Sequence, residues 1–119
     1  LSQEAPSLVF TSAGTYAVFA APRYKEIKVV DLDSKQIIQT INTPERTNLR
    51  LSIGVNELQI AGFDNHNVYV WNILSAKMLF KYSVPEYKKI RTAKFSKDGK
   101  HLIVGTEASV LVFEVPINK

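Results

Sequence analysis

The chain alternates between short apolar runs of four to six residues and the polar turns that separate them. The runs are rich in Val, Ile, Phe and Tyr and are bounded by Gly, Pro, Asn or Asp, a combination that favours β-strands. No window spaces its apolar residues at i, i+3, i+4 and i+7, which is the spacing of an amphipathic helix. The pattern therefore predicts an all-β chain with eleven strands.

One apolar run recurs three times, at steps of about 42 residues. Each copy ends in a bulky apolar or aromatic residue that is followed by Asp, Asn or Glu, and the copies are Glu26–Asp31, Asn67–Asn72 and Ser109–Glu114. A second mark lies upstream, where Phe10, Leu51 and Phe95 each stand before a glycine-containing turn and seven residues ahead of another apolar run. These pairs predict β-hairpins, and the third contains the strong turn signal Asp98-Gly99.

The repeat predicts three blade-like units of four strands each, at about residues 6–47, 48–89 and 90–119. Fourth strands are expected at Gln36–Ile41 and Lys77–Val84, whereas the third unit lacks its final strand. The second and third strands of the units are apolar on both faces, so both faces need cover. In a β-propeller a neighbouring unit supplies that cover.

Several of these stretches resemble the WD-repeat (WD40-like) β-propeller family. The third copy is similar to the family's hairpin followed by its signature strand, and the second carries the tryptophan as Trp71-Asn72, with Ser75 and Lys77 at the polar turn. The family's Gly-His dipeptide is absent from every copy, and only Trp71, Thr106 and Glu107 match parts of its side-chain network. The resemblance implies a partial propeller over residues 1–119, in a divergent branch of the family. It also implies a non-catalytic scaffold for protein partners within a larger multiprotein assembly.

Closed propellers have about four to eight blades, so three blades would leave two apolar blade faces uncovered. We expect the remaining blades to come from the parent chain or from a second copy of this chain. The edge of Val110–Val115 is expected to pair with a strand from elsewhere, because a third unit without its final strand leaves that edge open.

A β-propeller places the loops from second to third strands, and from fourth to next first strands, on one face of the ring. Nine candidate partner-binding residues fall in those loops, most of them basic or aromatic: Arg23, Tyr24, Lys25, Arg46, Phe63, His66, Tyr87, Lys88 and Lys89. Arg and Tyr commonly anchor protein interfaces, and loops on a rigid scaffold concentrate binding residues. The plain alternative is that these segments are ordinary solvated turns.

The charge of the chain bears on the class of partner. Fifteen Lys and Arg residues against 11 Asp and Glu give a net charge of +4 at pH 7, a modest excess that suits acidic partners. A propeller that binds RNA or phosphoinositides through the same basic face is the alternative function. The paired-arginine motif Phe-Arg-Arg-Gly of the phosphoinositide-binding propellers does not occur in this sequence.

Catalytic and metal chemistry is sparse in the sequence. His66 and His101 stand about 35 residues apart without a metal-binding spacing, and the chain has no cysteine. Asp31, Asp33 and Asp64 fit turns better than paired acid and base carboxylates, and no Gly-x-Ser-x-Gly elbow occurs. We therefore expect no enzyme activity, no catalytic or metal-binding residue and no cofactor. The lack of cysteine fits a reducing compartment, so an intracellular location, cytoplasmic or nuclear, is expected, without a transmembrane segment.

Overall fold

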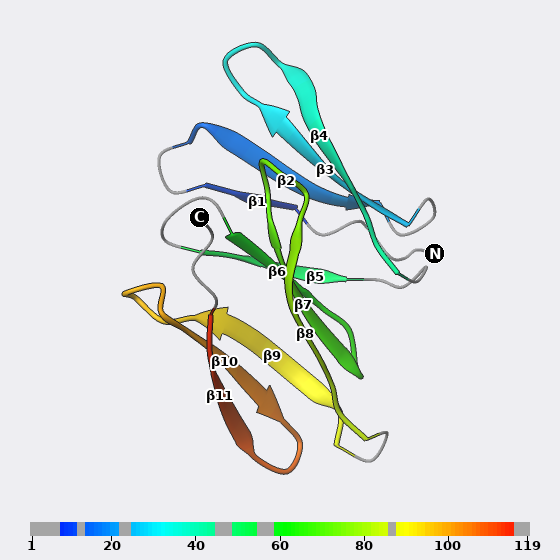
Figure 1. Cartoon of the computed structure of the whole chain (residues 1–119), viewed down its shortest axis with the longest axis vertical. Coiled ribbons are helices and arrows are strands. Elements are labelled where there is room, and N and C mark those ends of the chain that lie inside the picture. Colours follow the sequence, from blue (N-terminus) through cyan, green and yellow to red (C-terminus); the bar gives the residue numbers. More distant parts are fainter. Residues whose placement is uncertain are drawn as a thin grey trace.

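The computed structural model describes residues 8–11, 14–21, 25–44, 49–54, 59–85 and 88–115. In this part of the chain eleven strands form three antiparallel sheets, and no helix is present (Figure 1). Each sheet is built from strands that are consecutive in the sequence, and the second sheet lies between the first and the third. The prediction of an all-β chain made of three antiparallel strand units is confirmed.

The first sheet has the strand order β1-β2-β3-β4, and the second repeats this order with β5-β6-β7-β8. The third sheet contains β9, β10 and β11, so within the described residues it lacks a fourth strand. The strands are β1 (Leu8–Phe10), β2 (Tyr16–Ala21), β3 (Glu26–Asp31), β4 (Gln36–Asn42), β5 (Arg50–Ile53), β6 (Gln59–Phe63), β7 (Asn67–Asn72), β8 (Met78–Ser83), β9 (Ile90–Phe95), β10 (His101–Thr106) and β11 (Val110–Glu114).

The turns between third and fourth strands repeat in atomic detail. Asp31 Oδ1 accepts the backbone amides two and three residues ahead, at 2.9 and 3.3 Å. Asn72 Oδ1 does the same in the second sheet, with both distances at 2.8 Å. The strand pairing is also irregular at matching places, between Val29 and Val30 and between Val70 and Trp71. The Asp or Asn that follows the bulky strand residue is thus the turn-forming side chain.

The first hairpin of the second sheet differs in register from the sequence interpretation. Phe10 and Phe95 each pair with the residue seven positions ahead, as expected. In the second sheet the same spacing joins Ile53 to Ile60, while Leu51 pairs with Gly62. Ile53 therefore takes the place that the sequence assigned to Leu51. A shift of two residues keeps a strand side chain on the same face, so the spacing pattern alone could not separate the two.

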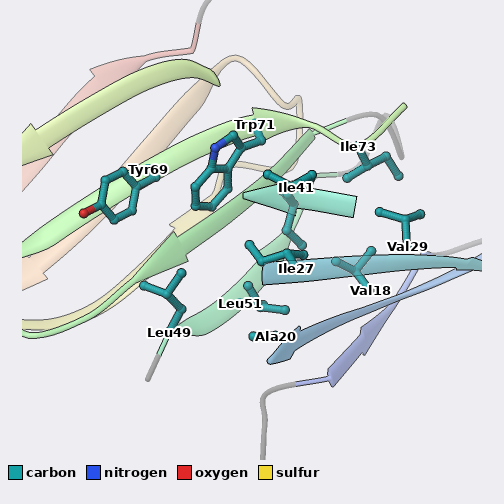
Figure 2. Close-up of a cluster of buried hydrophobic side chains, with 11 residues drawn as sticks. Val18, Ala20, Ile27, Val29, Ile41, Leu49, Leu51, Tyr69, Trp71 and Ile73 are labelled. Atoms are coloured by element: carbon teal, nitrogen blue, oxygen red, sulfur yellow. The ribbon is translucent and has the colours of Figure 1, made fainter. Parts of the chain in front are cut away.

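The three sheets pack face to face. Their first strands lie beside one another, because β1 contacts β5 and β5 contacts β9. Two clusters of buried apolar side chains fill the spaces between sheets. The cluster between the first and second sheets, which is drawn in Figure 2, is Val18, Ala20, Ile27, Val29, Ile41, Leu49, Leu51, Ile60, Tyr69, Trp71 and Ile73. The cluster between the second and third sheets is Ala61, Phe63, Val68, Val70, Val84, Ile90, Ala93, Leu102 and Val104.

Trp71 lies in the first of these clusters and is only 1% exposed, which confirms its prediction as a core residue between blades. Its ring stacks on that of Tyr69 with the centroids 5.3 Å apart (Figure 2). The ring needs a glycine on the neighbouring strand, since a Cβ at Gly62 would lie 2.9 Å from Trp71 Cζ3. One polar contact also crosses between the sheets, where Gln39 Nε2 donates to the carbonyl oxygen of Leu74 at 2.7 Å.

Candidate functional site

The loops that follow the second and fourth strands meet at one end of the stack, which we call the loop face. Backbone hydrogen bonds join these loops to one another. The amide of Thr43 donates to the carbonyl of Lys25 at 2.8 Å within the first sheet. The amide of Ile90, at the start of the third sheet, donates to the carbonyl of Asn65 in the second at 2.8 Å. The described segments of the loop face are therefore tied together within the first sheet and between the second and third sheets.

Three of the predicted lysines lie on this face. Lys25 and Lys89 are exposed, and Lys88 is half-buried. Lys25 has a φ of 56°, in the left-handed region, and its carbonyl is fixed by the bond from Thr43. The carbonyl of Lys89 accepts the amide of Glu107 at 3.0 Å, so the loop before β9 is tied to the turn before β11. Four other predicted residues, Arg23, Tyr24, Arg46 and Tyr87, lie outside the described residues.

The two remaining predicted residues have more interior positions. Phe63, the last residue of β6, is 6% exposed and belongs to the cluster between the second and third sheets. The guanidinium of Arg50 lies over its ring, 4.8 Å from the centroid. Phe63 thus offers a partner little surface of its own and supports an exposed cation instead. His66 is half-buried, and its carbonyl accepts the amide of Val84 at 2.8 Å.

Two polar pairs on the loop face were not found from the sequence. Arg91 forms an ion pair with Glu107, and Ser83 Oγ donates to Asn67 Oδ1 at 2.5 Å. Each pair is 16 residues apart in the chain and is brought together by neighbouring strands. The sequence did contain the information needed to find them. Once the hairpins are assigned, the register of the paired strands brings the two residues of each pair side by side. Arg91 adds a further cation to Lys25, Arg50, Lys88 and Lys89 on the described loop face, but it is partly neutralised by Glu107.

Asp64 organises the loop between β6 and β7. Its Oδ1 accepts the backbone amides of His66 and Asn67, both at 2.8 Å. This is the arrangement of a turn-forming aspartate, which agrees with the interpretation of Asp64 from the sequence.

The opposite end of the stack, the turn face, carries the short turns within the hairpins. Asp98 Oδ1 accepts the hydroxyl of Ser96 at 2.6 Å and the amide of Lys100 at 2.9 Å. These two bonds, the hydroxyl first and the amide second, lower the pKa of Asp98 below its ordinary value. Exposed lysines occur on this face as well, namely Lys35, Lys77, Lys97 and Lys100. Positive charge alone does not distinguish the two faces, so the interlocked loops are the distinguishing feature of the loop face.

Among the residues that the structure describes, neither face gathers a recognisable catalytic set. His66 lies on the loop face, whereas His101 begins β10 next to the turn face, so the sheets separate the two histidines. Within the described ranges no three His, Asp or Glu side chains are grouped so that they would hold a metal ion. Thr106, which the sequence linked to the tryptophan network, instead orders the turn before β11: its Oγ1 accepts the amides of Ala108 and Ser109 at 3.1 and 2.9 Å.

Comparison with known sequences gives matches to proteins that carry WD repeats. The F-box/WD repeat-containing protein 2 of Rattus norvegicus is 35% identical over 81 residues, which cover 68% of this chain and 16% of that protein. The protein of the same name from Homo sapiens is 33% identical over 81 residues, with the same coverage. This chain thus spans about a sixth of the length of the curated relatives that it matches. No family model matches the sequence.

Comparison with solved structures gives a WD40-repeat domain and an enzyme with the same arrangement of strands. The crystal structure of RRP9 WD40 repeats superimposes with a TM-score of 0.77 over 97% of this chain and 37% of that one, at 18% identity. A hydrazine synthase from Kuenenia stuttgartiensis superimposes with a TM-score of 0.74 over 96% of this chain and 34% of that one, at 13% identity. At such low identity these likenesses concern the fold alone. The described part of the chain contains no helix that is long and apolar enough to span a membrane.

Proposed function

Because the chain is of the WD-repeat β-propeller type, with three blade-like sheets, we propose that it is a non-catalytic scaffold that docks protein partners within a larger assembly. The docking surface is the loop face. The predicted blades span about residues 6–47, 48–89 and 90–119. Each blade contributes loops to the loop face. The partner is a protein with an acidic segment, and the location is intracellular, in keeping with a chain without cysteine.

One observation carries the proposal, namely the backbone bond between the Ile90 amide and the Asn65 carbonyl, which joins loop segments of the second and third sheets. The Glu107 amide bonded to Lys89 then ties two loop segments within the third sheet. A surface that is already ordered loses less entropy on binding than separate mobile turns would. Ordinary solvated turns, the competing interpretation, need no such cross-links.

The positive charge of the loop face supports an acidic partner. Lys25 and Lys89 are exposed, and Arg50 is exposed over the Phe63 ring. Three described carboxylates near this face already have partners, since Asp64 accepts two loop amides, Glu26 pairs with Lys28 and Glu107 pairs with Arg91. The face therefore presents cations whose charge is only partly compensated, and a complementary acidic segment would be attracted to it.

The test uses two charge-reversed triple variants of equal net charge. The loop-face variant is Lys25→Glu, Lys88→Glu and Lys89→Glu, and the control on the turn face is Lys77→Glu, Lys97→Glu and Lys100→Glu. Partners are enriched from cell extract on each protein, cross-linked and mapped to the chain. We expect the partners that cross-link to the loop face of the wild type to be lost from the first variant and kept by the control. Equal loss from both variants would contradict the proposal.

A salt series separates this function from binding to RNA or acidic lipid. Contacts with phosphate groups lose affinity steeply as salt rises, because bound counterions are released. Protein docking on the loop face is expected to weaken only modestly between low and physiological salt. A steep loss, together with binding to single-stranded RNA or to phosphoinositide vesicles, would assign the face to the alternative function.

A further inference from the structure

Arg91 and Glu107 form an ion pair on the loop face, between the start of β9 and the turn that joins β10 to β11. Both side chains reach solvent, since that of Arg91 is 66% exposed and that of Glu107 is 38% exposed. An exposed pair of this kind contributes little to stability, because water screens the attraction and two long side chains lose freedom. The pair can therefore open without disturbing the fold.

The backbone on either side of the pair is held by contacts that do not involve the pair itself. Ile90, next to Arg91, is 0% exposed in the cluster between the second and third sheets. The amide of Glu107 donates to the carbonyl of Lys89 at 3.0 Å. Thr106 Oγ1 orders the turn around Glu107 by accepting the amides two and three residues ahead. The guanidinium and the carboxylate thus stay within reach of each other whether or not they are paired.

The guanidinium of Arg91 is only partly used by Glu107. A single hydrogen bond joins them, from Nη2 of Arg91 to Oε2 of Glu107. A guanidinium carries five N–H donors and can hold one carboxylate through two parallel bonds. A carboxylate that makes both bonds would bind Arg91 better than Glu107 does, and the exposed Lys89 on the same face would add to the attraction.

We propose that Glu107 competes with the docking partner for Arg91, and that Arg91 binds a carboxylate of the partner's acidic segment once Glu107 has released it. One carboxylate replaces another at the same guanidinium, so the cation is paired before and after docking. Only a segment whose carboxylate displaces Glu107 is held, and the ion pair thereby discriminates against weakly acidic partners. This inference rests on the function proposed for the loop face.

Binding of a fluorescein-labelled hexaglutamate peptide, followed by fluorescence anisotropy at constant salt, tests the competition. Glu107→Gln is expected to tighten binding about two- to fivefold, which lies within the range for loss of an exposed ion pair. Arg91→Gln is expected to weaken binding. Glu114→Gln is the matched control, because it removes one exposed carboxylate at the other end of the same hairpin and changes the net charge equally. We expect the control to tighten binding less than Glu107→Gln does.

A double-mutant cycle separates the competition from the general effect of charge. With Arg91→Gln already present, Glu107→Gln has no guanidinium to release, so it is expected to tighten binding no more than Glu114→Gln does. Tightening by Glu107→Gln that is equally large without Arg91 would overturn the proposal, as would no tightening in its presence.

The loop-face variant of the preceding section distinguishes failure of this inference from failure of the proposed function. If that variant loses the peptide while Glu107→Gln binds it as the wild type does, the competition is refuted and the docking function stands. If neither the wild type nor Glu107→Gln binds the peptide, both are refuted.

Discussion

Replacement of Gly62 by alanine tests how closely Trp71 is packed between the first two sheets. The new Cβ would lie 2.9 Å from Trp71 Cζ3, 3.4 Å from Leu49 Cδ1 and 3.5 Å from Leu51 Cδ2. The rigid indole ring cannot turn away within a cluster in which it is 1% exposed. Overpacking of this kind costs about 1–3 kcal/mol. Alanine in a strand recovers about 0.5–1 kcal/mol relative to glycine, because the unfolded chain is less free.

The net expectation for Gly62→Ala is a loss of about 1–2 kcal/mol in the free energy of unfolding. For a chain of this size that corresponds to a fall of roughly 4–8 °C in Tm. Gly105→Ala is the matched control. Its Cβ would meet only the Thr92 side chain, at 3.0 Å, and Thr92 is exposed, so its side chain can shift away from the new methyl group. Thermal unfolding followed by circular dichroism at one fixed protein concentration is expected to show no loss of stability for the control, and at most the gain of about 0.5–1 kcal/mol that alanine brings in a strand.

A double-mutant cycle identifies Trp71 as the cause. Trp71→Phe removes the ring atoms that meet the new methyl group, so the two substitutions together are expected to cost at least about 0.5 kcal/mol less than their sum. Strictly additive effects would refute the reasoning, as would a Gly62→Ala protein as stable as the wild type. Either result would mean that the ring does not occupy the space above Gly62.

Three further outcomes are expected. Trp71→Ala should lower the free energy of unfolding by about 3–5 kcal/mol in urea titrations, because it leaves a large cavity between the sheets. Asn72→Ala should cost about 1 kcal/mol, since two turn amides lose their acceptor, whereas Asn72→Asp should keep most of the stability. Ser96→Ala should raise the pKa of Asp98 toward its ordinary value in a carboxyl NMR titration, because it removes the bond that lowers the pKa most. The stability that ionised Asp98 contributes is present above its unfolded-state pKa and is lost as the pH falls through the lowered folded-state pKa.

Much of the fold could be predicted because the same local chemistry occurs at matching places in the repeat. Asp31 and Asn72 follow bulky strand residues and form the same turn, so the sequence indicated both the strand ends and the repeat length. The register of the second hairpin could not be predicted in the same way. Leu51 and Ile53 are both apolar and lie on one face of the strand, and only the pairing with β6 separates them.

The candidate site was harder to predict from the sequence than the fold was. Its location at one end of the stack follows from strand connectivity, and the predicted lysines Lys25, Lys88 and Lys89 lie there. The burial of Phe63 was missed because a strand with both faces covered carries apolar residues without alternation, so the sequence does not show where exposure begins. The Arg91–Glu107 pair was missed because it follows only from the register of β9 and β10, which has to be assigned before the two residues can be placed beside each other.

The central claim is that consecutive sheets stack as blades through the Trp71 cluster and so hold the loop face together. Nuclear Overhauser effects from the Trp71 indole protons in the native protein test this most directly. We expect contacts between the indole protons and methyl groups of the first sheet, including those of Ile27 and Ile41, because these side chains share the cluster in Figure 2. Contacts confined to residues of the second sheet, in a protein with intact β-sheet content, would contradict it.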